Sequence, residues 1–191
     1  DVGSGKTILA FLLMTYVCEN GYQSVIMAPT EILARQHYQT FLSYIEKYDL
    51  PFSCELLTGS HTAKQKKEIY GRIAEKKPMY IIGTHALIQE KVNYENIALV
   101  ITDEQHRFGV KQRNLLAEKG GHPFSLVMSA TPIPRTLSMI LYGDMNISVV
   151  SDVPNTRLPI KNTVIREDKR TSVYHFIAKQ IQIDRKSTRL N

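Results

Sequence analysis

Apolar residues alternate along the chain between two patterns. Short continuous runs of Val, Ile, Leu and Met predict strands that are covered on both faces, as in a parallel sheet. Segments with a helical pattern lie between these runs. The predicted strands are residues 24–28, 54–57, 79–82, 97–102, 125–129 and 147–150, and the predicted helices are residues 7–19, 31–47, 63–75, 111–119 and 135–141.

This alternation predicts an α/β fold with a doubly wound parallel sheet and right-handed crossovers, which we expect to span residues 1–152. The pattern changes after that point. Residues 153–159 have the composition of a connector, and they precede a predicted strand near 161–165 and a predicted helix near 171–183. We therefore expect residues 153–191 to lead towards another domain, with residues 184–191 disordered or artefactual.

A glycine-rich segment directly precedes the first predicted helix. Gly5, Lys6 and Thr7 match the end of the P-loop, Gly-x-x-x-x-Gly-Lys-Thr, and Gly3 and Ser4 fill variable positions of it. The first glycine of the motif would precede residue 1, so the match is incomplete and we expect the sequence to begin within the motif. Glycines let backbone N–H groups converge on phosphate oxygens, and the helix start adds further N–H groups. An ordinary turn before a helix is the alternative.

The segment predicts two specific roles in binding ATP. Lys6 would reach the β- and γ-phosphates, and the Thr7 hydroxyl would bind Mg²⁺.

Two adjacent carboxylates, Asp103 and Glu104, follow the apolar run at residues 97–102. Open α/β sheets bind ligands at the carboxyl ends of strands, so these side chains should lie beside the P-loop. We expect Asp103 to hold Mg²⁺ through its water, and Glu104 to orient the attacking water and take up its proton. The two acids would repel each other without a cation, which Lys6 and Mg²⁺ would supply. A solvated acidic loop is the alternative.

Six short segments resemble the motifs of superfamily 2 helicases, in the same order. They are Gly5-Lys6-Thr7, Ala28-Pro29-Thr30-Glu31, Thr58-Gly59-Ser60, Gly83-Thr84-His85, Asp103-Glu104-Gln105-His106 and Ser129-Ala130-Thr131. Residues 103–110 and 129–137 narrow the resemblance to the RecG family and to the transcription-repair coupling translocases. Gln105, together with residues 28–31, favours the RecG family. The resemblance covers residues 1–164.

The resemblance implies the first RecA-like motor domain, a P-loop NTPase domain, of an ATP-dependent DNA helicase that uses ATP and Mg²⁺. Such helicases act on branched or forked DNA, in fork reversal and junction remodelling during recombination and repair. The residues that would face the DNA backbone are Pro29, Thr30, Gly59, Ser60, Thr84 and His85. The residues that would link the γ-phosphate to the grip on DNA are Gln105, His106, Ser129, Ala130 and Thr131. Arg107 and Arg135 would either join this link or serve as ordinary ion-pair partners.

The family's second RecA-like domain, which carries an arginine finger, has no counterpart in the sequence, and neither has its wedge domain for branched DNA. An arginine finger contributes about 10³–10⁵ in rate. We therefore expect this chain alone to bind Mg-ATP weakly and to hydrolyse it negligibly.

Composition changes this picture only slightly. A net charge of +6 and a pI of about 9.3 weakly favour a polyanionic partner. The sequence lacks a run of about eighteen apolar residues, so we expect no contact with a membrane. Cys18 and Cys54 lack metal-ligand spacing, which favours free thiols in a reducing cytoplasm, at the nucleoid for a bacterial DNA motor. Two other hypotheses remain: the motor of a transcription-repair coupling translocase, and a non-motor nucleotide-binding switch.

Overall fold

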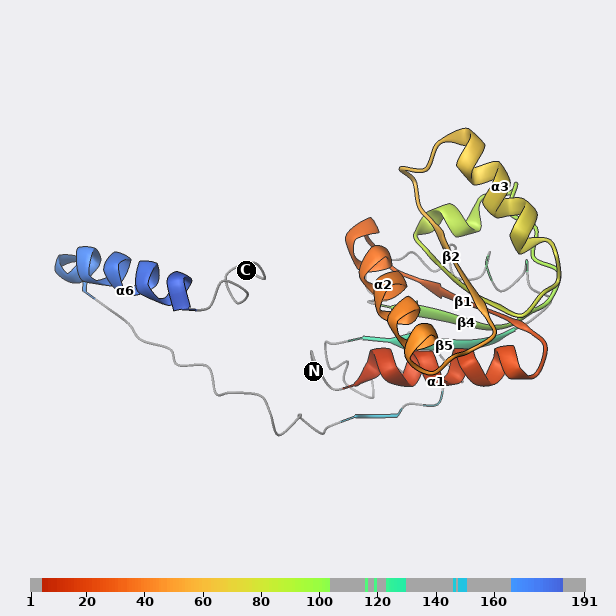
Figure 1. Cartoon of the computed structure of the whole chain (residues 1–191), viewed down its shortest axis with the longest axis horizontal. Helices are drawn as coiled ribbons and strands as arrows, with labels where there is room; N and C mark the ends of the chain where they lie inside the picture. The colour runs from red at the N-terminus through yellow and green to blue at the C-terminus, as the bar shows by residue number, and fades with distance from the viewer. Residues whose placement is uncertain are drawn as a thin grey trace. The chain divides into compact units, whose positions relative to one another are not determined.

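The computed structural model describes residues 5–103, 116, 119, 123–129, 146, 148–150 and 166–183. The chain divides into two compact units, Asp1–Pro154 and Asn155–Asn191. The first unit contains a five-stranded sheet between helices (Figure 1). The assignment of residues 1–152 to the first motor domain, and of residues 153–191 to a connector that leads towards another domain, stays a prediction.

The sheet is parallel throughout, as predicted. It contains β1 (Gln23–Met27), β2 (Ser53–Leu57), β3 (Met79–Gly83), β4 (Ile97–Asp103) and β5 (Phe124–Met128). The strand order is β2-β3-β1-β4-β5, and each neighbouring pair is parallel. Every residue of β1 and β3 is buried, and the apolar residues within both strands are accordingly continuous rather than alternating.

One predicted strand was wrong. Residues 148–150 have no regular secondary structure, and the side chain of Val149 is 84% exposed. An apolar run forms a strand only where a neighbouring strand completes its hydrogen bonds, and periodicity cannot establish that neighbour.

The helices of the first unit follow the predicted segments closely. They are α1 (Lys6–Glu19), α2 (Glu31–Lys47), α3 (Ala63–Ile73) and a short 3₁₀ helix, η1 (His85–Ile88). Helix α3 ends two residues earlier than predicted. Of the helix predicted at 111–119, the structure describes Leu116 and Lys119, both helical. The helix predicted at 135–141 lies outside the described residues.

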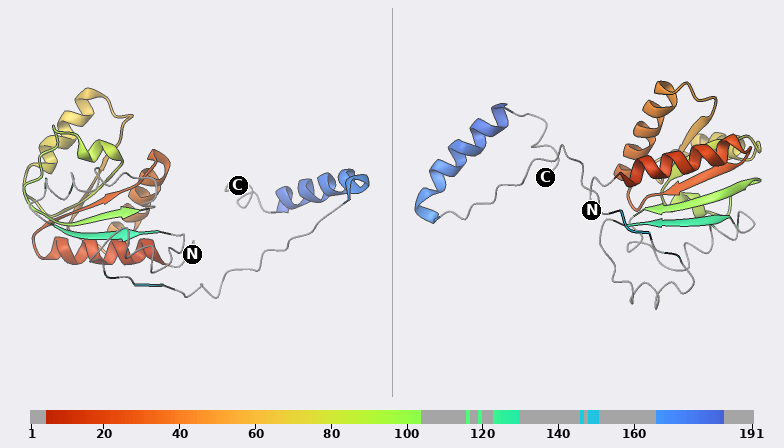
Figure 2. Two further views of the ribbon diagram at one scale, coloured as in Figure 1. Left: turned by 180° about the vertical axis from the view of Figure 1, so that it is seen from behind. Right: turned by 90° about the horizontal axis from the view of Figure 1, so that it is seen from below.

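Each face of the sheet has its own apolar core. Helices α1 and α2 pack on one face, and α3 and η1 pack on the other (Figure 2). Successive residues of β1 alternate between them, with Ile26 in the first core and Val25 and Met27 in the second. In the first core, Phe11 of α1 lies 5.1 Å from Phe41 of α2, measured between ring centroids. This aromatic contact fixes α1 and α2 beside each other over the strands.

The carboxyl ends of all the strands meet at one edge of the sheet, because the strands are parallel. Only three residues separate α1 from β1, so the helix runs antiparallel to the strand and begins at this same edge. Figure 2 shows the arrowheads of β4 and β5 pointing towards the side on which α1 begins.

The described part of the second unit contains a 3₁₀ helix, η3 (Glu167–Lys169), and helix α6 (Arg170–Ile183). The prediction of a helix at residues 171–183 is therefore confirmed. The strand predicted near 161–165 lies outside the described residues. No helix in the described part of the chain is long and apolar enough to cross a membrane.

Both cysteines are free thiols, as predicted. Cys18 is buried in α1, where loss of solvent raises the pKa of its thiol to about 11. Burial raises the pKa of the Cys54 thiol as well. Neither group has the lowered pKa of a reactive cysteine.

Candidate functional site

The start of α1 depends on the conformation of a glycine. Gly5 is the N-cap residue and has φ +86° and ψ +10°, a left-handed conformation that costs other residues about 1–2 kcal/mol. No side chain among the described residues caps the first turn. The N–H groups of Lys6 and Thr7 therefore begin a helix whose positive end is suited to an anion. Gly3 and Ser4 lie outside the described residues.

Asp103 is the last residue of β4, so it lies at the edge of the sheet where α1 begins. Its Oδ2 atom lies 2.9 Å from Nε2 of His37, on α2. The two side chains are only 13% and 8% exposed. An ionised carboxylate can only accept hydrogen bonds, so Nε2 of His37 donates this one. Glu104, Gln105 and His106 lie outside the described residues.

Sequence reasoning missed His37, although α2 contains a signal for it. The buried positions of this helix are Ala34, His37 and Phe41, spaced by three and four residues. A histidine within such an apolar stripe needs a buried hydrogen-bond partner. The pattern could therefore have shown that His37 has a partner, although it could not have identified Asp103.

The loop after β1 carries two of the residues predicted to face DNA, Pro29 and Thr30. Both are half-buried. Thr30 is the N-cap of α2, and its Oγ1 accepts a hydrogen bond of 3.3 Å from the backbone N–H of Leu33. The hydroxyl thus already stabilises the helix start.

The loop after β2 carries Gly59 and Ser60, which are both exposed. Ser60 Oγ donates a 2.6 Å hydrogen bond to Oε1 of Glu31, the first residue of α2. Arg35 pairs with the same carboxylate at 2.7 Å, and its Nη2 also donates to Ser60 Oγ at 3.3 Å. The hydrogen bond from Ser60, and then Arg35, hold the pKa of Glu31 below its usual value. This contact ties the loop after β2 to the start of α2.

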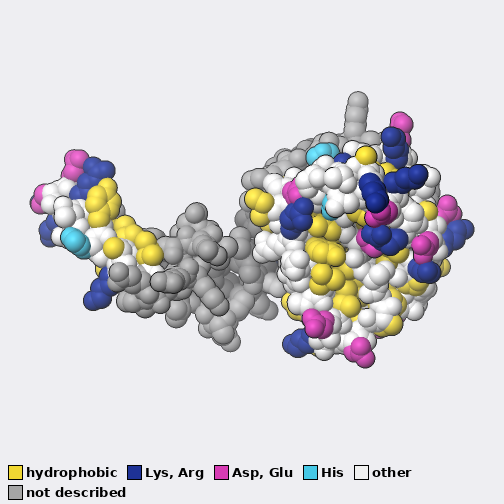
Figure 3. Space-filling model, turned by 45° about the horizontal axis from the view of Figure 1, so that its top comes forward, with side chains coloured by type: hydrophobic (Ala, Val, Ile, Leu, Met, Phe, Trp, Pro, Cys, Tyr) yellow, Lys and Arg dark blue, Asp and Glu magenta, His cyan; other side chains and the backbone are white. Residues whose placement is uncertain are grey.

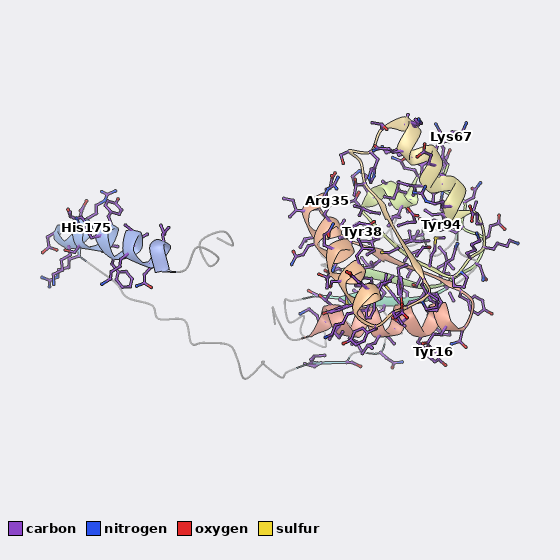
Figure 4. The ribbon with its side chains drawn as sticks, viewed as in Figure 1. Tyr16, Arg35, Tyr38, Lys67, Tyr94 and His175 are labelled. Carbon is purple, nitrogen blue, oxygen red and sulfur yellow. The ribbon has the colours of Figure 1, made fainter. Side chains whose placement is uncertain are left out.

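Basic side chains surround this loop. Lys66 Nζ donates a 2.9 Å hydrogen bond to the carbonyl oxygen of Gly59. Lys64 and Lys67 also lie on α3, and Figure 3 shows basic side chains gathered over this part of the first unit. Figure 4 shows Arg35 projecting from α2 and Lys67 from α3. The loop therefore lies in a setting that can attract phosphate groups.

The loop after β3 is packed closely against β2. A Cβ atom at Gly83 would lie 2.2 Å from the carbonyl oxygen of Leu57, so only glycine fits there. Thr84 donates its backbone N–H to the same carbonyl at 3.2 Å. Its side chain is 4% exposed, and Oγ1 has no hydrogen-bond partner among the described residues. His85 is exposed. At the surface of this loop, His85 is thus the accessible side chain and Thr84 is buried support.

Ser129 follows β5 and therefore lies at the same edge of the sheet. The other residues predicted to link hydrolysis to DNA, Ala130 and Thr131, lie outside the described residues, as do Arg107 and Arg135.

The family model for DEAD/DEAH box helicases matches residues 1–140. The chain belongs to the DEAD/DEAH box helicase family. This membership confirms the predicted fold class, a RecA-like doubly wound parallel sheet.

The relatives within this helicase family confirm the resemblance to RecG. The ATP-dependent DNA helicase RecG of Aquifex aeolicus is 47% identical over 184 residues, which are 95% of this chain and 23% of that protein. RecG of Bacillus subtilis is 43% identical over 98% of this chain and 27% of its own length. The chain thus spans about a quarter of the length of these relatives.

Solved helicase structures agree with the fold. A structure of RecG bound to a three-way DNA junction superposes with a TM-score of 0.78 at 38% identity, over 95% of this chain and 24% of that one. The helicase domain of Pyrococcus furiosus Hef, 19% identical with a TM-score of 0.54, covers 73% of this chain and 30% of its own length. At that identity the similarity to Hef concerns the fold alone.

The residues at the edge of the sheet suit the ATP and Mg²⁺ that this helicase family implies. Mg²⁺ prefers hard oxygen ligands and usually keeps water and phosphate oxygens beside one or two protein groups. The Asp103 carboxylate and the Thr7 hydroxyl are ligands of that kind. The described residues contain no cluster of three or more His, Cys, Asp or Glu side chains that could hold a metal by itself. A site completed by nucleotide phosphates fits this donor set better than a self-sufficient metal site.

Proposed function

We propose that this chain is the ATP-binding motor domain of a DNA helicase that moves along branched or forked DNA. One observation carries the proposal. The start of α1, with Gly5, Lys6 and Thr7, lies at the same edge of the sheet as Asp103, although the two segments are far apart in the sequence. Family membership and the RecG relatives support the same function.

The residues of this edge have distinct roles in the proposed nucleotide site. Gly5 lets the backbone approach the phosphates, and Lys6 binds the β- and γ-phosphates. Thr7 and Asp103 would hold Mg²⁺, and the ion would offset the charge of the phosphates. Glu104, next to Asp103 in the sequence, orients the attacking water and accepts its proton.

The DNA backbone would lie along the loops after β2, β3 and β1, which are neighbours in the sheet. Gly59, Ser60 and His85 provide exposed groups there, while Pro29 and Thr30 form the adjoining start of α2. Short hydroxyls and backbone groups can bind phosphates without reading the sequence. Thr84 is part of this surface only as a buried support.

The nucleotide and the DNA would thus occupy neighbouring parts of one edge. Asp103, the proposed ligand of Mg²⁺, ends β4, and Ser129 follows β5, beside it in the sheet. Gln105 and His106 would link the γ-phosphate to Ser129, Ala130 and Thr131, so that hydrolysis alters the grip on DNA. A second RecA-like domain and a wedge domain of the longer protein would complete the motor.

The proposed DNA partner is branched, because the RecG structure is described as bound to a three-way junction. We propose fork reversal and junction remodelling as the cellular role, in the bacterial cytoplasm at the nucleoid. The RecG relatives favour this role over that of a transcription-repair coupling translocase or a non-motor switch.

A substitution in the longer protein tests the proposal. Glu104→Gln keeps the size of the side chain and removes the base, so ATP binding should persist while DNA-stimulated hydrolysis falls by about 10²–10⁴-fold. Hydrolysis is measured with a three-way junction, and ATP binding with a fluorescent nucleotide. Retained turnover would remove Glu104 from its role, and a wild-type protein that neither hydrolyses ATP nor unwinds junctions would overturn the proposed function.

A further inference from the structure

The hydrogen bond between His37 and Asp103 differs from the ion pairs of the described residues. Both of its side chains are at most 13% exposed. In the pairs Arg35–Glu31, Arg72–Glu55, Lys76–Glu95 and Lys77–Glu75, the basic side chain is at least 47% exposed. Exposed ion pairs contribute little to the stability of the fold, because water competes for both partners. A buried donor or acceptor that loses its partner is costly, so the His37–Asp103 contact is held firmly.

The helix that carries His37 is itself fixed at two places. Thr30 caps its start through Leu33, and Phe41, one turn after His37, packs against Phe11. The imidazole therefore reaches Asp103 from a rigid support. The contact sets the position of Oδ2 and, through the planar carboxylate, the direction of the other oxygen as well.

We propose that His37 is a positioning residue for Asp103. By donating its Nε2 proton to Oδ2, it holds the carboxylate in the orientation that binds the Mg²⁺ of the bound nucleotide. Hydrogen bonds to the side chains that bind a metal commonly determine its affinity, and their loss costs about 10–100-fold. This inference rests on the proposed function, since it requires Asp103 to serve the Mg-nucleotide.

The experiment measures equilibrium binding of a fluorescent, slowly hydrolysed ATP analogue to the whole chain, with saturating Mg²⁺ and in EDTA. The Mg²⁺-dependent gain in affinity is the ratio of the two dissociation constants. His37→Leu removes the donor and should reduce this gain by about 10-fold or more. Affinity in EDTA should stay unchanged, because it does not involve Asp103.

Two conservative variants, His37→Gln and His37→Asn, test the inference even if His37→Leu fails to fold. The amide of His37→Gln reaches the position of Nε2 and should restore the gain to within about threefold, whereas the shorter His37→Asn should not. Arg72→Leu, which breaks the exposed pair with Glu55, is the matched control and should leave the gain unchanged.

The outcomes separate this inference from the proposed function. If wild-type chain shows no Mg²⁺-dependent nucleotide binding, the proposed function fails and the inference fails with it. If the wild-type chain shows the gain but His37→Leu keeps it, or loses affinity equally in EDTA, only the role of His37 is overturned. Equal behaviour of His37→Gln and His37→Asn also overturns it.

Discussion

Helices α1 and α3 both begin at the carboxyl edge of the sheet, yet their first turns are satisfied in opposite ways. Helix α3 has a capping box: Thr62 Oγ1 accepts from the N–H of Gln65 at 3.3 Å, and Gln65 Oε1 accepts from the N–H of Thr62 at 2.9 Å. Helix α1 begins at Gly5 and has no such side-chain cap among the described residues. The capping box of α3 stabilises its helix start without a ligand. A helix start without a side-chain cap lacks about 1 kcal/mol of this stabilisation, and a bound anion can supply it instead.

The largest expected difference between the two helix starts concerns their lysines. Lys6 lies in the first turn of α1 and Lys64 in the first turn of α3. Lys6→Ala would remove several charge-assisted hydrogen bonds from the Lys6 ammonium group to the phosphates. It should therefore raise the Kd for Mg-ATP about 100-fold or more. Lys64→Ala should change it less than about twofold. Calorimetric titration measures the Kd for Mg-ATP of both variants. Equal effects would contradict the proposed difference between the two helix starts.

The second difference concerns the glycine at the start of α1. Gly5→Ala forces an alanine into φ +86°, so the free energy of unfolding should fall by about 1–2 kcal/mol. We also expect the Kd for nucleotide to rise about tenfold, because the loop that approaches the phosphates is distorted. Gly59→Ala is the control: a Cβ there meets nothing within 4 Å, and nucleotide affinity should not change. Urea unfolding and nucleotide titration report the two quantities.

The third difference is one of stability alone. Thr62→Ala removes the capping box of α3 and should lower the free energy of unfolding by about 1 kcal/mol. Nucleotide affinity should stay at the wild-type value, because the nucleotide phosphates are proposed to bind at the start of α1 and not at the start of α3. A loss of nucleotide binding without a loss of stability in urea would show that the capped helix start also serves the site.

The smallest expected effect has the opposite sign. Gly71 lies inside α3, and a Cβ at this position meets nothing within 4 Å. Gly71→Ala should therefore raise the free energy of unfolding by about 0.5–1 kcal/mol. The same change at Gly5 should destabilise. Thermal unfolding followed by circular dichroism checks the sign, and destabilisation at Gly71 would show that the helix interior has no room for the added methyl group.

Much of the fold could be predicted because its signals are local. Buried parallel strands are continuous apolar runs, and the predicted strands β1 to β4 were placed within a residue or two of their bounds. The run at residues 147–150 looked the same and forms no strand in the described residues 148–150. The difference depends on a neighbouring strand, which no local pattern contains. In the same way, Thr84 was expected at the surface, but the close approach of β3 to β2 buries it.

The sequence by itself determined the types of the elements and the chemistry at their ends, since apolar periodicity and the torsional freedom of Gly5 act between near neighbours in the chain. The alternation of strands and helices already predicted that the P-loop and Asp103 would lie at one edge of the sheet. Only the tertiary structure decided the strand order and the packing of α2, which places His37 against Asp103, 66 residues away. Contacts of that separation depend on how whole elements bury their apolar faces, which no short segment encodes.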